Sequence, residues 1–185
     1  VVLVKTKDGF NLQSTKGLFR RNVVDIDIAF PIVHGNNAED GTLQGYLDSV
    51  GIPYVGSRVL GSALGQDKVI MKQVFKSENL PIVDYIWFFD YEYYDNEKQI
   101  KNNILKLGLP VVVKPANLGS SVGISFVKNE DGLEKAIEEA LMYDKKIIVE
   151  KAVSNLVEVN CSVLGDYQSQ ETSKIEEVMA SEEFL

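Results

Sequence analysis

The residues that decide how this chain folds are Val111-Val112-Val113-Lys114-Pro115-Ala116-Asn117-Leu118-Gly119-Ser120-Ser121-Val122-Gly123. The β-branched run before Lys114 predicts a strand that ends at a lysine, and the glycine–serine segment predicts a turn into a second strand over Ile124 to Val127. A P-loop or a dinucleotide fingerprint would instead place its glycines at the start of a helix. The stretch therefore predicts a loop between two strands, in which backbone amides and the hydroxyls of Ser120 and Ser121 can donate to phosphate oxygens.

Two lysines flank this loop in the predicted structure. Lys114 lies within an apolar strand, where a charge is costly unless it meets an opposite charge. Lys68 starts a helix expected from about Asp67 to Ser77. A single lysine is more often solvated surface, but two lysines beside a glycine–serine loop indicate a site for an anion.

Periodicity predicts an α/β fold around this stretch. Alternating or continuous apolar residues predict strands at 24–30, 85–89 and 145–150. Apolar residues spaced three and four apart predict helices at 43–50, 96–107 and 129–141. The glycines at 56, 61 and 65 indicate a flexible segment and a domain boundary. We expect three parts: 1–59, 60–149 and 150–185.

The segment from Lys146 to Val153 has the form of a hinge that binds a nucleotide base. A strand end offers backbone donors and acceptors to adenine, and Glu150 can accept from the adenine amino group. Downstream, polar and apolar residues alternate from Glu158 to Val163, which predicts a strand with one polar face. Glu158 on that face is a candidate partner for ribose hydroxyls.

Composition excludes several classes of protein. The 185 residues carry a formal net charge of −8, which argues against a nucleic-acid partner. Cys161 is the only cysteine, so no intrachain disulfide forms, and no apolar run is long enough to cross a membrane. We expect a soluble cytoplasmic protein. The chain opens on Val1 without an initiator methionine, and we expect missing sequence at both ends.

Several motifs, taken in order, closely resemble those of the D-alanine:D-alanine ligase family. They span about residues 24 to 165 and comprise Pro31-Ile32-Val33-His34-Gly35, Glu39-Asp40-Gly41-Thr42-Leu43-Gln44-Gly45, Gly51-Ile52-Pro53-Tyr54-Val55-Gly56-Ser57, Ser62-Ala63-Leu64, Asp67-Lys68 and the stretch from Val113 to Ser125. A glycine loop alone would be weak evidence for the family, whereas this set of motifs in this order is specific for it.

The resemblance implies a set of site residues. Lys68 and Lys114 would hold ATP phosphates, and Ser121 would line the phosphate flap. Ser120 would orient the first D-alanine, with His34 beside it. The remaining implied residues surround the nucleoside: Glu150, Lys151 and Val153 at the adenine, the last two through backbone atoms, and Glu158 at the ribose. No catalytic residue is assigned within the chain, and metal ligands are expected beyond Leu185.

The resemblance also implies an ATP-grasp fold, with an incomplete N-terminal parallel-sheet domain, a central lobe and a truncated C-terminal lobe. The implied homodimer would use ATP and Mg²⁺ (or Mn²⁺) to join D-alanine to a second D-amino acid through an acyl phosphate, for peptidoglycan synthesis. Two alternatives stay open: another ATP-grasp carboxylate–amine ligase, and a catalytically silent nucleotide-binding module.

The identity of the second substrate is also undecided among D-alanine, D-serine and D-lactate. The stretch Ser173-Lys174-Ile175-Glu176-Glu177-Val178-Met179-Ala180 resembles the branch that includes vancomycin-resistance D-alanine:D-serine ligases.

Overall fold

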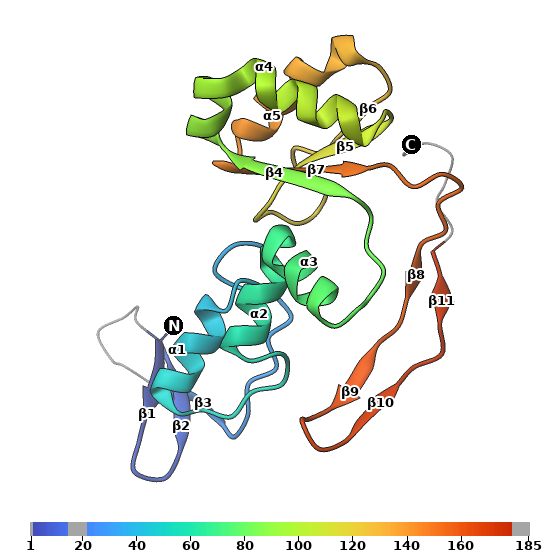
Figure 1. Cartoon of the computed structure of the whole chain (residues 1–185). Helices are drawn as coiled ribbons and strands as arrows, with labels where there is room; N and C mark the ends of the chain where they lie inside the picture. The colour runs from blue at the N-terminus through green and yellow to red at the C-terminus, as the bar shows by residue number, and fades with distance from the viewer. Residues whose placement is uncertain (1, 15–21, 179–185) are drawn as a thin grey trace. The chain divides into compact units, whose positions relative to one another are not determined.

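The computed structural model describes residues 2–14 and 22–178 (Figure 1). The chain divides into two compact units, Val1–Ala152 and Val153–Leu185. No helix in the described ranges is both long and apolar enough to span a bilayer. The three-part division at residues 59 and 149 stays a prediction.

The first unit is organised around a four-stranded antiparallel sheet in the order β4-β7-β5-β6. Its strands are β4 (Tyr85–Phe89), β7 (Lys146–Lys151), β5 (Val111–Pro115) and β6 (Ser125–Val127). All four of these strands were predicted from the sequence and are confirmed, to within about one residue at each end. Because side chains alternate along each strand, the sheet presents two different faces.

One face of this sheet carries the main hydrophobic core. Helices α4 (Asp90–Leu107) and α5 (Leu133–Leu141) cover it (Figure 1). Val113, Val149 and Ile147 point into this core and are fully buried, together with Ile104 and Leu133 from the helices. The predicted apolar stripe of α5 is confirmed, with Leu133, Ala136, Ile137 and Ala140 all buried.

The opposite face packs against α3 (Lys68–Ser77). Val69 of this helix is fully buried with Ile148 of β7 and Ala116, and Tyr85 packs beside them. Asp67 begins the helix, because its carboxylate accepts from the backbone amides of Val69 and Ile70. This small cluster holds the helix that carries Lys68 against the strands that carry Lys114 and Glu150.

The N-terminal residues form a separate antiparallel sheet of β1 (Val2–Lys5), β2 (Phe10–Gln13) and β3 (Asn22–Ile26). A turn at Asp8-Gly9 joins the first two strands, and the Thr6 amide donates to the Gly9 carbonyl. A parallel sheet is therefore wrong for these strands. Parallel pairing occurs among the described residues at one bridge, Ala29 with Tyr54.

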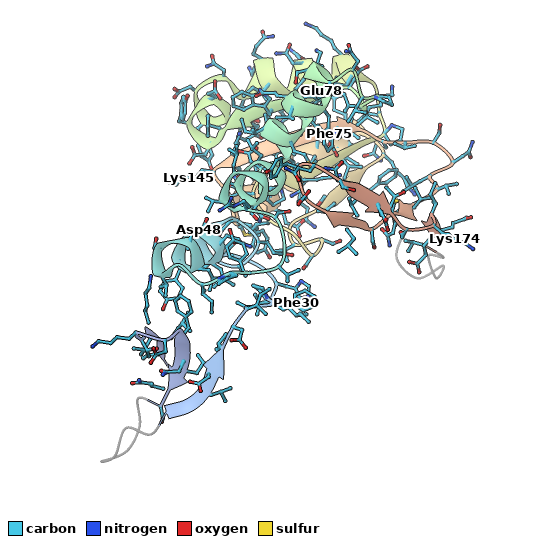
Figure 2. All side chains as sticks on the ribbon, turned by 90° about the horizontal axis from the view of Figure 1, so that it is seen from below. Phe30, Asp48, Phe75, Glu78, Lys145 and Lys174 are labelled. Atoms are coloured by element: carbon cyan, nitrogen blue, oxygen red, sulfur yellow. The ribbon has the colours of Figure 1, made fainter. Side chains whose placement is uncertain are left out.

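The strand expected over 24–30 ends at Ile26. Ile28 and Phe30 (labelled in Figure 2) are 56% and 68% exposed, so the apolar alternation beyond Ile26 does not mark a buried strand face. The predicted helix over 43–50 is confirmed as α1 (Thr42–Val50), and Gly51 ends it in the left-handed conformation, with φ 86°.

The glycine-rich segment expected to be flexible is instead the helix α2 (Val59–Gln66). Gly61 and Gly65 lie inside this helix, and the Ser62 amide donates to the Arg58 carbonyl in its first turn. Glycine weakens a helix without preventing it, so the two glycines are compatible with α2.

Two other helices begin differently from the expectation. The helix expected near Asn96 starts at Asp90, because Glu92 Oε2 accepts from the Phe89 amide and caps the preceding turn. Asn96 is a kink within it, with φ −139° and ψ 38°. Ahead of α5, Glu130–Gly132 form the 3₁₀ turn η1.

The second unit is a long antiparallel ribbon. Strands β8 (Val159–Asn160) and β11 (Glu176–Glu177) pair, and β9 (Val163–Gly165) pairs with β10 (Gln170–Thr172). The continuous strand expected over 158–163 is thus interrupted, and both of its expected faces are exposed. Met179 and Ala180, from the stretch that resembles the D-serine branch, lie outside the described residues.

Candidate functional site

The side chain of Glu150 joins two lysines from different elements. Its Oε1 atom lies 2.7 Å from Lys72 Nζ of α3, and its Oε2 atom lies 2.5 Å from Lys114 Nζ of β5. The register of the sheet explains the second contact, since Val112 pairs with Glu150 and Lys114 with Ile148, which places all these side chains on the face toward α3. The predicted partner of Lys114 is therefore, in this structure, Glu150.

Burial and charge act in opposite directions on Glu150. Burial of the carboxyl raises its pKa, but the hydrogen bonds and positive charges of Lys114 and Lys72 together outweigh burial and leave the pKa below its ordinary value. Glu150 is therefore ionised at neutral pH. Both oxygens of the proposed adenine acceptor are bound by ammonium groups.

Lys68, the other lysine that the sequence indicated, lies beside the glycine–serine loop. Its Nζ atom donates to the carbonyl oxygen of Leu118, and to that of Ala116 at 3.4 Å. Burial lowers the pKa of Lys68, and the nearby charge of Lys114 lowers it further. Lys68 and Lys114 are thus close enough for their charges to interact, while their binding of phosphate stays a prediction.

The base of the glycine–serine loop is fixed by side chains. Asp144 Oδ2 accepts from the backbone amide of Asn117 at 2.8 Å and from its side-chain amide at 2.9 Å. Gln66 Nε2 donates to the Asn117 carbonyl at 2.8 Å. These bonds hold the start of the loop between α2 and the residues before β7.

The tip of the loop is held in an uncommon backbone conformation. Ser120 and Ser121 have φ values of 53° and 58°, in the left-handed region that residues other than glycine seldom adopt. Gly123 has φ 68°, and a Cβ atom there would lie 2.9 Å from Pro115 Cγ and 2.8 Å from the Tyr143 ring. Only glycine fits that position without a shift of its neighbours.

His34 and Ser120 border one region of the first unit. His34 Nδ1 lies 3.5 Å from Glu39 Oε1, and Glu39 Oε2 accepts from the Gly35 amide at 2.7 Å. The Gly35 hydrogen bond is the main reason that the pKa of Glu39 is below its ordinary value. A cavity of about 480 Å³ is lined by Glu39, Gln44, Ser57, Ser62 and Ser120, among others. Ser120 and Glu39 therefore line this cavity, whereas His34 is connected to it only through its contact with Glu39.

The segment predicted to bind adenine, Lys146 to Val153, is divided between the two units. The Lys151 amide donates to the Asp84 carbonyl at 2.9 Å, and Lys151 Nζ donates to the Leu107 carbonyl. Its amide is thus already used within the sheet. Val153 and Glu158 belong to the second unit and are exposed. Their nucleoside roles stay predictions.

Sequence reasoning missed Lys72, Asp144 and Glu39. Lys72 follows Lys68 by four residues, a spacing that puts both on one side of a helix and was the available signal. Asp144 gave no signal, because its role depends on backbone amides that the fold brings to it. Glu39 belongs to a motif that carries the family resemblance, but the resemblance assigned it no role.

The described ranges, 2–14 and 22–178, contain no cluster of three or more His, Cys, Asp or Glu side chains arranged to hold a metal ion. The carboxylates nearest to the lysines are already bonded: Glu150 to Lys72 and Lys114, and Asp67 to Lys146 at 2.7 Å.

A glycine–serine loop between antiparallel strands, above a sheet face with several lysines, defines the class of α/β proteins that bind nucleotide phosphates by such a flap. Comparison with known families gives the finer assignment. Residues 74–185 match the model of the D-ala D-ala ligase C-terminus, and residues 4–57 match that of the D-ala D-ala ligase N-terminus. The chain belongs to the D-alanine–D-alanine ligase family, and the ATP-grasp fold class is confirmed.

Individual relatives agree with this assignment. The D-alanine–D-alanine ligase of Thermoanaerobacter sp. (strain X514) is 47% identical over 159 residues, covering 86% of this chain and 44% of that protein. The ligase of Borreliella afzelii is 45% identical over 152 residues, covering 81% and 42%. This chain therefore spans a little under half the length of these relatives.

Solved structures show the same fold. The D-alanine–D-alanine ligase from Coxiella burnetii has a TM-score of 0.80 and 30% identity, with 96% of this chain and 50% of that chain covered. The VanG D-Ala:D-Ser ligase from Enterococcus faecalis has a TM-score of 0.77 and 31% identity, with 95% and 49% covered.

Proposed function

We propose that this chain supplies the phosphate-binding part and much of the first-substrate site of an enzyme that ligates D-alanine to a second D-amino acid with ATP. The observation that supports this most strongly is the position of Lys68 and Lys114 at the glycine–serine loop in a chain of this family. Carboxylate activation by phosphorylation would yield an acyl phosphate, ADP and then phosphate, in peptidoglycan precursor synthesis.

The lysines would act by holding negative charge in place. Lys114 has three N–H donors, of which Glu150 takes one, so its remaining donors can bind phosphate oxygens. Lys68 would leave the Leu118 carbonyl and turn to the same phosphates, with the amides near Ser121 above them. Phosphoryl transfer depends chiefly on such positioning and charge stabilisation.

Magnesium, or manganese, is included in the proposal because phosphoryl-transfer sites use a metal to bridge and neutralise phosphate oxygens. Its protein ligands are expected outside residues 1–185.

The cavity lined by Glu39 and Ser120 would take the first D-alanine. Ser120 Oγ would donate to or accept from the amino acid, and Glu39 would fix His34 through their contact. The hydroxyl of Ser121, the next residue of the loop, would bind phosphate.

For the second substrate we propose D-alanine. The relatives with the higher identities, 47% and 45%, are D-alanine–D-alanine ligases, whereas the D-Ala:D-Ser ligase from Enterococcus faecalis is 31% identical. D-Serine is the second candidate because of that neighbour. We also propose that the protein is cytoplasmic, which the use of ATP and the single cysteine support. From the family resemblance we propose a homodimer.

The test uses the purified full gene product. ATP and Mg²⁺ are supplied with D-alanine alone, with D-alanine plus D-serine, or with D-alanine plus D-lactate, while phosphate release is followed and products are identified by mass spectrometry. D-Alanyl-D-alanine as the main product supports the proposal. A mixed product containing D-serine or D-lactate would reassign the second substrate, and phosphate release that does not respond to D-alanine would exclude the function.

A further inference from the structure

Two ionic contacts attach α3 to β7, and they differ in composition. Asp67 and Lys146 form a one-to-one pair, with Oδ2 and Nζ 2.7 Å apart. Glu150 is instead shared by two cations, Lys72 and Lys114. The second contact therefore carries more positive than negative charge.

Lys72 is the less accessible of the two cations. Its side chain is 11% exposed, against 25% for Lys114, and its Nζ atom lies 5.6 Å from the centre of the Tyr85 ring. Tyr85 pairs with Glu150 across the sheet, so it encloses Lys72 and the carboxylate together. Lys72 is thus poorly placed to bind a ligand itself, whereas Lys114 is more open.

The two carboxylate oxygens are divided between the two lysines. Lys72 occupies Oε1, which leaves only Oε2 for Lys114. Without Lys72, the whole charge of Glu150 would act on Lys114, and both oxygens could accept from it. Lys114 paired with both oxygens would present a smaller net positive charge, and fewer N–H donors, to a phosphate.

We propose that Lys72 is a positioning residue that acts through Glu150 to keep N–H donors of Lys114 open toward phosphate. Lys72 need not touch the nucleotide for this effect. The inference rests on the proposed function, because it concerns how well the same phosphate site works.

A double-mutant cycle distinguishes an effect of Lys72 that acts through Glu150 from a direct contact of Lys72 with phosphate. Lys72→Met keeps most of the buried stem and removes the charge. Binding of ATP and of inorganic tripolyphosphate to the full gene product is measured by calorimetry, for Lys72→Met, for Glu150→Gln and for the double variant. Lys72→Arg tests rescue by a conserved charge, and Lys76→Met, an exposed lysine one turn further along α3, is the matched control.

Lys72→Met should weaken binding of both probes roughly tenfold in the wild-type background, which is about the loss of one charge-assisted hydrogen bond. In the Glu150→Gln background the same substitution should change affinity less than about twofold, because the carboxylate through which Lys72 acts is gone. Lys72→Arg should bind both probes more tightly than Lys72→Met, and Lys76→Met should match wild type.

Equal losses in both backgrounds would overturn the proposal, since they would mean that Lys72 contacts phosphate or only supports the fold. An unchanged affinity in Lys72→Met would also overturn it, and thermal unfolding of each variant checks that the fold is intact. If the wild-type protein binds neither ATP nor tripolyphosphate, the proposed function fails as well. If it binds both, and Lys72→Met loses the same affinity in both backgrounds, only the role of Lys72 is rejected and the proposed function remains.

Discussion

Lys146 Nζ lies 2.7 Å from Asp67 Oδ2, so the residue that caps α3 is also bound to strand β7. The other oxygen of Asp67 accepts from the amides of Val69 and Ile70. One carboxylate thus fixes both the start of the helix and its place on the sheet. Lys68, the next residue, is positioned by this double attachment.

Asp67→Ala should therefore lower the free energy of unfolding by about 2–3 kcal/mol, from the loss of the helix cap and of a partner for a buried lysine. Asp67→Asn should cost less, because its amide oxygen can still cap the helix. Urea unfolding measures both, with the exposed Asp95→Ala as control. Equal losses for the alanine and asparagine variants would show that the cap adds nothing.

Asp144 should matter for both stability and nucleotide binding. Asp144→Ala leaves the Asn117 amide without its acceptor and frees the start of the glycine–serine loop, which should cost about 1–3 kcal/mol of stability. ATP affinity should fall severalfold because the loop is no longer fixed. Calorimetry at a temperature where the variant is folded measures the second effect, with the exposed Asp131→Ala for comparison. Full ATP affinity in Asp144→Ala would mean that the loop does not depend on this attachment.

Glu150 should contribute to stability in a pH-dependent way. Its pKa in the folded protein is below the ordinary value of 4.5, so its contribution is fully present above pH 4.5 and is lost as the pH falls through the lower folded value. Wild type should therefore lose stability on acidification more steeply than Glu150→Gln. Urea midpoints from neutral pH into the acid range compare the two. Parallel curves would show that Glu150 is not held ionised by Lys72 and Lys114.

Glu158 is predicted to accept from the ribose hydroxyls. Glu158→Gln should then weaken binding of ATP more than that of deoxyATP, since only ATP offers the 2′-hydroxyl. Competition binding with the two nucleotides measures the difference, and Glu171→Gln, also exposed on the second unit, serves as control. Equal changes for both nucleotides would remove Glu158 from the ribose site.

The part of the site near Lys114 was predictable because it depends on local pattern. A β-branched run, a lysine and closely spaced glycines each restrict the backbone over a few residues, and β5, the loop and β6 follow from them. The partners of that lysine were not predictable in this way. Lys72 and Glu150 are far apart in sequence and meet only because α3 packs on one face of the sheet.

The same distinction explains the errors in the fold. Glycines at 61 and 65 suggested flexibility, but helical hydrogen bonding and contacts with neighbouring helices determine the conformation of α2. The alternation over 24–30 suggested one strand, but strand length depends on a partner, and β2 pairs with β3 only as far as Ile26.

The central claim is that Lys114 binds the phosphates of ATP. The most direct measurement is ATP affinity by calorimetry for the wild-type full gene product, Lys114→Ala and the exposed-lysine control Lys145→Ala (labelled in Figure 2). The account predicts that Lys114→Ala binds ATP at least about tenfold more weakly, from the loss of charge-assisted hydrogen bonds, while Lys145→Ala binds as wild type does. Wild-type affinity in a Lys114→Ala protein that is folded by circular dichroism would contradict it.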